Sequence, residues 1–306
     1  MVVEIRNYRS NDFQQVLKLL QNNMEFDFIS EEVLEEKLTG DPGWNPKSTF
    51  VTQKEGRVAG FMQGVYRNVR GVRYGYIKLM AVEKESRKQG IARAMYLQLE
   101  DYFERNKVDA VRIYDVPLNY FMPGIDPRYT AAVCFAERMG FVRNGDTSNL
   151  DIDLQHQNWS EQTKIEELKA QQIEVSRATE ADRAEITELL GTDWHLWQYE
   201  VDRAIESSPP SLHIARLNGK VLAFAAHNAN NKGTGWFGPM LTHNDMRGKG
   251  IGGVLLKLCL QDMKNEGLEK SIIPWVGPIP FYAHQANAKV ARVFWRYEKK
   301  LTTPKI

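Results

Sequence analysis

A six-residue pattern occurs twice in this chain, and this recurrence limits the possible folds more than any other feature. The second copy reads Arg247-Gly248-Lys249-Gly250-Ile251-Gly252, and the first reads Arg87-Lys88-Gln89-Gly90-Ile91-Ala92. The copies lie 160 residues apart (247 − 87), each between a strand-like and a helix-like stretch. Further pairs share the offset: Gly75 with Gly235, Met80 with Met240, and Val116 with Val276. A period so far above the range of solenoid repeats indicates a duplicated domain.

The position of each copy at a strand-to-helix turn predicts an anion site. Glycines let the main chain approach a ligand closely, and the first helical turn has N–H groups without partners inside the helix. These groups and the positive end of the helix dipole favour a pyrophosphate, to which Arg247, Lys249, Arg87 and Lys88 add positive charge. A surface turn rich in Gly and Lys is the alternative for a single copy. Two copies in the same setting favour two phosphate loops.

The pattern Arg-x-x-Gly-x-Gly/Ala in this setting resembles the pyrophosphate loop of the GNAT superfamily of acetyl-CoA-dependent acyltransferases. The resemblance covers nearly the whole chain as two successive domains. It implies an α/β fold of two tandem GNAT domains, each a mixed twisted sheet flanked by helices and splayed between its fourth and fifth strands. It also implies acetyl-CoA as the cofactor. The sequence contains no P-loop pattern and no Gly-x-Gly-x-x-Gly after a strand, so other nucleotide-binding folds fit poorly.

Two similar series of predicted elements follow one another along the chain. We predict an N-terminal domain over residues 1–154, a linker over 155–172, and a C-terminal domain over 173–306. Asn218-Gly219 between two apolar runs predicts a tight β-hairpin. The predicted strands are 2–8, 48–53, 57–66, 72–82 and 111–116, then 173–177, 212–217, 221–228, 236–242, 271–276 and a closing strand at 290–299. The main predicted helices are 89–103, 131–139, 161–168 and 250–263.

Composition narrows the range of partners. The net charge is +1, which indicates neither a nucleic acid nor an anionic membrane as the main partner. No stretch approaches the ~20 apolar residues of a membrane span, and the first residues lack the apolar core of a signal peptide. Cys134 and Cys259 lie in apolar helical patterns and are expected to be buried thiols, with no metal site. We expect a cytoplasmic protein that binds acetyl-CoA and a small amine, and a homodimer stays open.

Differences between the halves indicate which one carries out chemistry. Phe281-Tyr282 resembles the pair at the start of the final helix in many GNAT enzymes, whose tyrosine supports departure of the CoA sulfur. The resemblance gives that role to Tyr282. The first half has Phe135-Ala136 there, and the offset falls from 160 to 146 (282 − 136), so it has 14 extra residues, including 119–129. Tyr120 or Tyr129 could replace the lost hydroxyl, although a longer loop is the interpretation that we favour.

Gly238-Pro239 inside the predicted strand 236–242 supports the same choice. Proline cannot donate to a β-ladder, so it implies an edge strand or a bulge. The resemblance implies a bulge that turns a backbone N–H toward the thioester carbonyl, with Leu241, or else Met240, as the donor. The residues implied to bind the cofactor are Met240, Leu241, Thr242 and the loop 247–252 in the second half, and Met80, Val82 and the loop 87–92 in the first.

The implied reaction is attack of a neutral primary amine on the acetyl thioester. An alkylammonium has a pKa near ~10, so the reaction needs a base or an unusually acidic amine. The candidate bases in the second half stay unranked: Asp193, His195, Glu200, Asp202, His227 and His243.

The placement of tryptophans gives a hint of the acceptor class, because indole faces suit sugar rings or cations, whereas core packing is the alternative for any single one. Four are predicted around the second-half cleft: Trp194, Trp197, Trp236 and Trp275. The runs 272–282 and 294–299 are similar to bacterial tandem GNAT proteins that include glucosamine and glucosaminide N-acetyltransferases. An amino sugar or glucosaminide is therefore the leading acceptor. The alternatives are a protein N-terminus, an aminoglycoside, a thiol-cofactor precursor, or an acetyl-CoA-binding sensor or scaffold with one inactive half.

Overall fold

The computed structural model describes residues 4–301 and divides the chain into two compact units. Unit 1 consists of the chain up to Thr147 and of the segment that begins at Val293, whereas unit 2 is Ser148–Arg292. The strand predicted over 2–8 begins outside the described residues and is observed from Glu4. Among residues 4–301, no helix has the length and apolar character needed to cross a membrane.

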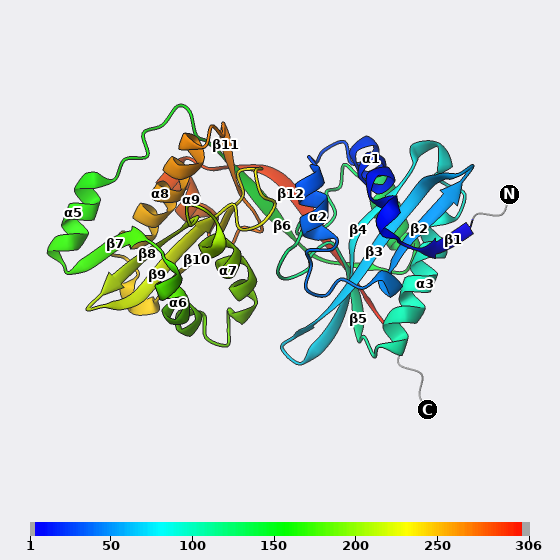
Figure 1. Ribbon diagram of the computed structural model, residues 1–306, viewed down its shortest axis with the longest axis horizontal. Helices are drawn as coiled ribbons and strands as arrows, with labels where there is room; N and C mark the ends of the chain where they lie inside the picture. Colours follow the sequence, from blue (N-terminus) through cyan, green and yellow to red (C-terminus); the bar gives the residue numbers. More distant parts are fainter. Residues whose placement is uncertain (1–3, 302–306) are drawn as a thin grey trace. The chain divides into compact units, whose positions relative to one another are not determined.

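The helices and strands follow the duplicated pattern (Figure 1). The elements that begin in unit 1 are β1 Glu4–Asn7, η1 Ser10–Asp12, α1 Phe13–Asn23, α2 Glu31–Lys37, η2 Pro46–Ser48, β2 Thr49–Lys54, β3 Arg57–Val69, β4 Val72–Val82, η3 Lys84–Ser86, α3 Ile91–Arg105, β5 Ala110–Ile113, α4 Thr130–Arg138 and β6 Val142–Asp153. Those that begin in unit 2 are α5 Gln162–Ala170, β7 Ile173–Arg177, η4 Glu180–Asp182, α6 Arg183–Leu190, η5 His195–Trp197, α7 Gln198–Glu206, β8 Leu212–Leu217, β9 Lys220–His227, β10 Phe237–Thr242, η6 Asn244–Met246, α8 Ile251–Asn265, β11 Lys270–Ile273, α9 Ile279–Ala286 and β12 Lys289–Lys300.

Unit 1 is a mixed sheet with helices on both faces. Its strand order is β1-β2-β3-β4-β5-β12, and only β4 and β5 run parallel. Gly64 on β3 points toward α3, because a Cβ there would lie 2.2 Å from a methyl group of Leu99. The neighbouring Gln63 points to the opposite face, where its Nε2 donates to the carbonyl of Lys37 in α2 at 3.0 Å.

The sheet in unit 2 repeats this arrangement, but its fourth and fifth strands, β10 and β11, are more widely separated than β4 and β5 are in unit 1. Strands β10-β9-β8-β7 form one antiparallel group, and β11 pairs with β6. Only an isolated parallel bridge, Trp236 with Ile272, joins the two groups. In unit 1 the pairing of β4 with β5 ends at Ile77 and Ile113. The predicted mixed sheet and its splay after the fourth strand are therefore observed in both units.

The last strand of each half completes the sheet of the other half. Glu298–Lys300 of β12 pair with β5 in unit 1, and Leu150–Asp153 of β6 pair with β11 in unit 2. The observed division therefore differs from the predicted ranges 1–154 and 173–306, because residues 148–154 belong to unit 2 and the closing strand belongs mainly to unit 1. Alternation along β12 reveals a strand but does not reveal which sheet edge it joins.

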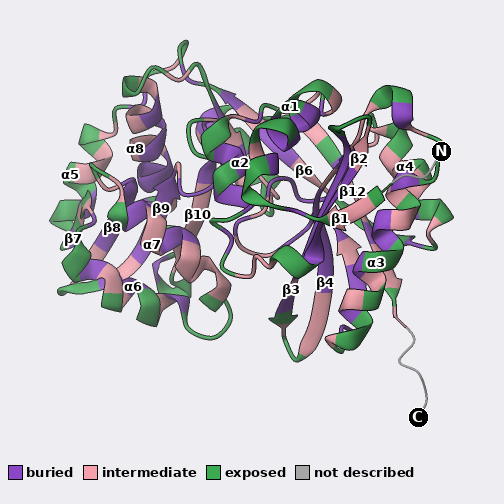
Figure 2. Ribbon diagram, turned by 45° about the vertical axis from the view of Figure 1, so that its right-hand side comes forward, coloured by how far each residue is buried: buried purple, intermediate pink, exposed green. Residues whose placement is uncertain are grey.

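Buried apolar side chains fill a separate core in each unit. Figure 2 shows burial concentrated along β3 and β4 in unit 1 and along α8 in unit 2. Cys259 lies in the α8 core, where burial raises the pKa of its thiol. Cys134, in contrast, is exposed, so the expectation of two buried thiols was wrong. The buried residue of α4 is Ala136, which lies two positions after Cys134 and therefore about 200° away around the helix axis.

Candidate functional site

The two predicted phosphate loops have the same backbone conformation. Each follows a short 3-10 helix, η3 or η6, and ends at a glycine that begins the next helix. Gly90 has φ 81° and ψ 0°, and Gly250 has φ 84° and ψ −1°. Both values are left-handed, and glycine adopts them without the steric cost of a Cβ. The first N–H groups of α3 and α8 therefore follow a tight turn, as an anion site requires.

The surroundings of these two glycines differ. A Cβ at Gly250 would lie 2.8 Å from Cε of Lys164, whereas nothing in residues 4–301 would lie within 4 Å of a Cβ at Gly90. Lys164 belongs to α5, and an ion pair between Glu161 and Lys257 joins the start of α5 to α8. Helix α5, which lies within the predicted linker 155–172, thus places the cation of Lys164 beside the second loop.

Two polar side chains of the first loop form hydrogen bonds within unit 1. Arg87 donates from Nε to the carbonyl of Val82 at 3.1 Å and from Nη2 to Asn23 at 3.2 Å. Gln89 donates to the carbonyl of Glu85 at 3.1 Å. These bonds hold the loop in place, but Arg87 would have to give up its own bonds before it could donate to a phosphate.

A bulge interrupts the fourth strand of each unit at equivalent positions. The register between β9 and β10 shifts between Phe237 and Met240, so Gly238 and Pro239 form the bulge. The bulge predicted from the proline is therefore confirmed. In unit 1 the register between β3 and β4 shifts at Lys78, which is 160 residues before Gly238. No proline marks that copy, and it was not predicted.

Three of the predicted segments meet in unit 2. A Cβ at Gly252 would lie 3.4 Å from Met240 and 3.4 Å from the ring of Phe281. Gly252 is in the first turn of α8, Met240 follows the bulge in β10, and Phe281 precedes Tyr282 in α9. Leu241 and Thr242, which continue β10, are half-buried, as is Met240. The loop, the bulged strand and the final helix therefore converge, although they are distant in sequence.

Tyr282 lies beside this convergence in an aromatic environment. Its ring packs edge-on against Phe237 and Phe281, at centroid distances of 6.1 Å and 5.0 Å. Burial raises the pKa of its hydroxyl. In the part of the chain that the structure describes, this hydroxyl forms no hydrogen bond.

The corresponding region of unit 1 is filled differently. Ala136 replaces the tyrosine and is buried. The hydroxyl of Tyr129 accepts from the Phe26 backbone N–H at 2.9 Å and donates to Asp27 at 2.7 Å. The extra segment also packs on α2, where Asn119 donates to the Glu36 carbonyl at 2.8 Å. These contacts favour the interpretation of a longer structural loop.

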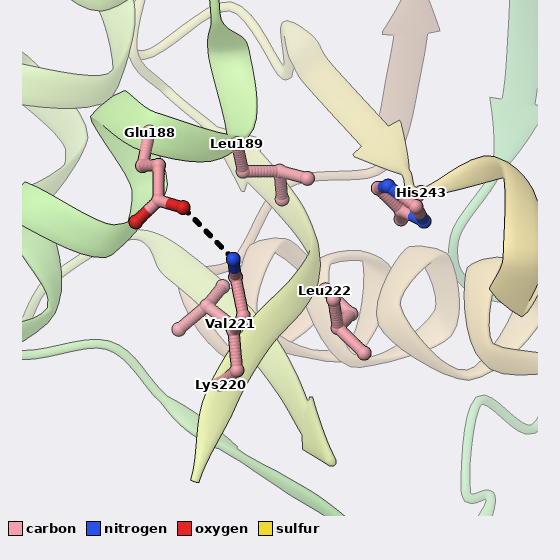
Figure 3. Close-up of a pocket in the computed structure, with 6 residues that line it drawn as sticks. All are labelled: Glu188, Leu189, Lys220, Val221, Leu222 and His243. Atoms are coloured by element: carbon pink, nitrogen blue, oxygen red, sulfur yellow. Dashed lines mark hydrogen bonds and ion pairs between the residues drawn. The ribbon is translucent and has the colours of Figure 1, made fainter. Parts of the chain in front are cut away.

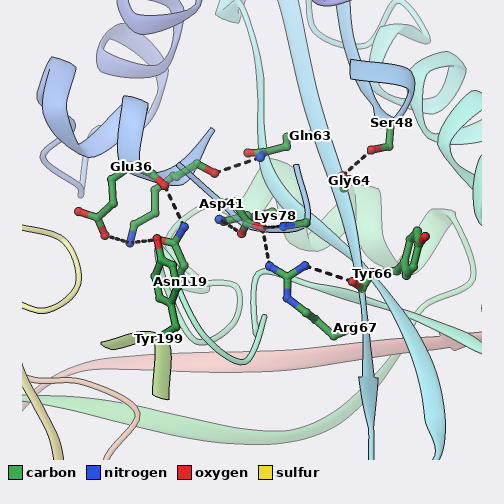
Figure 4. Close-up of polar contacts among 12 residues, drawn as sticks. Glu36, Asp41, Ser48, Gln63, Gly64, Tyr66, Arg67, Lys78, Asn119 and Tyr199 are labelled. Carbon is green, nitrogen blue, oxygen red and sulfur yellow. Dashed lines mark hydrogen bonds and ion pairs between the residues drawn. The ribbon is translucent and has the colours of Figure 1, made fainter. Parts of the chain in front are cut away.

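Unit 1 also contains a buried charged network that the sequence analysis missed (Figure 4). Asp41 forms ion pairs with Lys78 at the β4 bulge and with Arg67 on β3, the latter at 2.5 Å. Burial lowers the pKa of Lys78 to about 7, against the opposing charge of Asp41. Burial alone would raise the pKa of Asp41, but the two cations hold it below its usual value. A lysine within an otherwise apolar stretch of β4 was the available signal.

The candidate bases of unit 2 have varied surroundings. Asp202 forms an ion pair with Arg183, and the Nδ1 of His195 lies 2.7 Å from the carbonyl of Thr192. His227 is buried, and its Nε2 lies 3.5 Å from Glu266. Asp193 is exposed and Glu200 is buried. These surroundings do not select one residue as the base.

A surface hollow of about 330 Å³ in unit 2 has His243 on one side (Figure 3). Glu188 and Lys220 form a 2.8 Å ion pair across from it. The hollow includes none of the residues predicted to bind acetyl-CoA, so it is separate from the convergence around Gly252.

Two of the four tryptophans form a stacked pair in unit 2. The ring centroids of Trp194 and Trp197 lie 4.3 Å apart, with an interplanar angle of 27°. Trp194 is 44% exposed, whereas Trp236 is buried. An exposed indole of this kind offers a flat apolar face to a ligand.

Comparison with known proteins agrees with the duplicated architecture. The model of the Acetyltransferase (GNAT) family matches residues 13–141 and 178–284. No curated protein gave a significant match. The glucosamine N-acetyltransferase region of a fungal multi-domain β-N-acetylglucosaminidase has a TM-score of 0.81 at 17% identity, over 97% of this chain and 38% of that chain. The present chain therefore spans well under half the length of that protein.

Two other structures match nearly end to end. A GCN5-related N-acetyltransferase from Sphaerobacter thermophilus has a TM-score of 0.69 at 16% identity, over 97% of this chain and 95% of that chain. A tandem GNAT protein from the clavulanic acid biosynthesis pathway has a TM-score of 0.68 at 14% identity, over 98% of both chains. At these identities the similarity shows the fold, with two GNAT domains in tandem.

Proposed function

Because the chain belongs to the acetyltransferase (GNAT) family, and is thus an acyl-CoA-dependent N-acyltransferase, we propose that it acetylates the primary amine of an amino sugar or glucosaminide. We propose acetyl-CoA as the donor and unit 2 as the catalytic unit. The observation that carries this assignment is the convergence of Gly252, Met240 and Phe281 beside Tyr282. Unit 1 has a buried alanine where unit 2 has this tyrosine.

The proposed reaction follows from the polarity of a thioester. The neutral amine nitrogen attacks the carbonyl carbon and a C–N bond forms, after which the nitrogen releases one proton to water, the C–S bond breaks, and CoA leaves as a thiolate. The backbone N–H of Leu241, or of Met240, donates to the carbonyl oxygen as negative charge develops there. The Tyr282 hydroxyl donates a hydrogen bond to the departing sulfur. Because burial raises its pKa, it keeps its own proton and stabilises the thiolate as a donor.

The second phosphate loop supplies the binding site for the donor. The pyrophosphate of acetyl-CoA would accept hydrogen bonds from the first N–H groups of α8, which follow the left-handed turn at Gly250. Arg247 and Lys249 lie in the same loop, and Lys164 lies over Gly250. All three side chains are cations, so they favour a phosphate over a neutral group.

Two observations support an amino sugar as the acceptor. The stacked pair Trp194 and Trp197 offers an exposed ring to a sugar. The fungal region with the TM-score of 0.81 is described as a glucosamine N-acetyltransferase. The amine of an amino sugar is more acidic than that of lysine, so it needs less help from a base.

A panel of amines tests the proposal through the rate of CoA release. We expect the highest kcat/KM with glucosamine or a glucosamine oligomer, compared with an aminoglycoside, a peptide with a free N-terminus and a cysteine-containing sugar amine. A clear preference for one of the other amines would replace the proposed acceptor. Binding of acetyl-CoA without release on any amine would favour the alternative of a sensor or scaffold.

A further inference from the structure

A buried carboxylate in unit 1 is only half satisfied by protein contacts. Asp115 follows β5 and is 1% exposed. Its Oδ2 accepts from Nε of Arg296 at 2.9 Å and forms an ion pair with Nη2 of the same residue at 2.8 Å. Its Oδ1 is also buried and has no hydrogen-bond partner among the described residues. An unsatisfied buried polar atom costs about 1–3 kcal/mol, so this oxygen calls for a donor.

The backbone directs Asp115 away from the regular sheet. The pairing of β4 with β5 ends at Ile77 and Ile113, and the N–H of Tyr114 makes one more bond to the Ile77 carbonyl at 2.9 Å. Tyr114 then has φ 69°, a left-handed value that is costly for a bulky residue. The turn places Asp115 immediately beyond the point where the two strands separate.

The neighbours of Asp115 form a wall of aromatic and charged side chains. Tyr76 on β4 interacts electrostatically with Asp115, Arg112 and Arg67, and its ring packs with Val65 and Val116. Its hydroxyl forms no hydrogen bond to residues 4–301. Tyr74 and Tyr120 pack against the same apolar cluster. Aromatic rings beside a carboxylate favour a cationic ligand.

The remaining charges around the site balance. Arg112 on β5 lies 3.8 Å from Asp115 and 2.8 Å from Glu298 on β12. Arg296 lies on the same strand as Glu298 and pairs with Asp115. The carboxylates of Asp115 and Glu298 are therefore paired with the guanidinium groups of Arg112 and Arg296, and Oδ1 of Asp115 has no hydrogen-bond partner among residues 4–301. Burial raises the pKa of Asp115 to about 7, against the effect of Arg296 and Arg112.

We propose that unit 1 has its own binding site for a primary amine, in which the ammonium group donates to Oδ1 of Asp115 and lies beside the Tyr76 hydroxyl. The ligand class rests on the proposed function, since the amine is the acceptor consumed in unit 2. The site is distinct from the convergence of Gly252, Met240 and Phe281 in unit 2, because every residue that forms it belongs to unit 1. It gives unit 1 a role in holding the acceptor that does not require the missing tyrosine.

Equilibrium dialysis of the full chain with radiolabelled glucosamine tests this site. At about pH 7.5 we expect wild type to bind about two amines per chain and Asp115→Asn to bind about one, because the amide keeps the shape but removes the charge. Tyr76→Phe should raise the Kd for glucosamine at the Asp115 site about fivefold, which corresponds to the loss of one hydrogen bond. Asp146→Asn is the matched control, since Asp146 is an exposed aspartate of the same unit.

The pH dependence separates this site from a structural carboxylate. Below its pKa of about 7, Asp115 is protonated and loses its attraction for an ammonium group. Affinity at the site should therefore fall about tenfold between about pH 7.5 and about pH 5.5 in wild type, whereas Asp115→Asn should bind about one amine per chain at both pH values. Unchanged amine binding in Asp115→Asn would overturn the inference and leave a buried water as the partner of Oδ1. CoA release by wild type tests the proposed function separately.

Discussion

Units 1 and 2 turn the backbone in the same way at their phosphate loops but surround the turn with different side chains. Gly90 and Gly250 differ by only a few degrees in φ and ψ. Arg87 is bound to its own unit, whereas Lys164 reaches the second loop from another helix. Duplication has therefore kept the backbone geometry of the anion site while the side chains that decide its use have diverged.

The regions around the final helix show the same divergence. Unit 2 has Tyr282 with a hydroxyl that bonds to nothing in the described chain, whereas unit 1 has buried Ala136 and a Tyr129 hydroxyl that is engaged twice. A donor already bonded to the protein cannot serve a ligand without losing those bonds. This contrast predicts one catalytic unit, and matched substitutions in the two units test it.

The largest effect is expected from Gly250→Asp. The new side chain would collide with Lys164, strain a left-handed residue and place a carboxylate where phosphate binds. Loss of two charge-assisted hydrogen bonds corresponds to a fall in kcat/KM for acetyl-CoA of about 10³-fold. Gly250→Asn isolates the effect of the charge, because asparagine has nearly the size and backbone preference of aspartate but no carboxylate.

The matched substitution Gly90→Asp decides which loop is used. We expect it to change kcat/KM for acetyl-CoA much less than Gly250→Asp, although the two backbones are alike. These measurements need the full chain, because each half lacks the strand that completes its own sheet. An equal or larger loss in Gly90→Asp would transfer donor binding to unit 1.

A smaller effect is expected from Tyr282→Phe. The change removes one hydrogen-bond donor and keeps the packing against Phe237 and Phe281. We expect kcat to fall about 10²-fold with an unchanged Kd for acetyl-CoA, because the hydroxyl acts only as thiolate charge develops. Steady-state CoA release and calorimetry measure the two quantities.

Tyr129→Phe is the control from unit 1. It should leave kcat unchanged and lower the free energy of unfolding by about 1–2 kcal/mol, because two hydrogen bonds are lost. Wild-type kcat in Tyr282→Phe together with a slow Tyr129→Phe would reverse the assignment of the units.

The smallest effect is expected from Lys164→Ala. The side chain is partly exposed and pairs with Glu167 at 2.6 Å, so its charge is screened. An exposed ion pair contributes up to about 1 kcal/mol, which corresponds to a rise of about fivefold in KM for acetyl-CoA. Lys169→Ala on the same helix is the control and should leave KM unchanged. A fall in KM for Lys164→Ala would mean that Lys164 obstructs the loop.

Local features of the site were predictable because single residue types determine them. The glycines of the second loop predicted a strand-to-helix turn that a ligand can approach closely, and the proline in β10 predicted an edge strand or a bulge. Asn218-Gly219 predicted a two-residue hairpin, which joins Leu217 of β8 to Lys220 of β9. Each inference depends on the backbone preferences of a few adjacent residues.

The strand β6 and the networks of unit 1 were not predictable in this way. Val142–Asp153 is largely polar, and it is a strand because its end pairs with β11. Lys78, Asp41 and Asp115 are distant in sequence from most of their partners, so no local pattern reveals that they are buried together.

The duplication, the two strand–turn–helix loops and the bulge in β10 could be predicted from sequence patterns, because periodicity, glycine and proline act through a few adjacent residues. Three other features became visible only in the folded chain: β12 closes unit 1, Lys164 covers Gly250, and buried Asp115 has one carboxylate oxygen without a hydrogen-bond partner among residues 4–301. These features depend on which sheet edges and side chains meet after the chain has folded, and that choice is made by long-range pairing and burial.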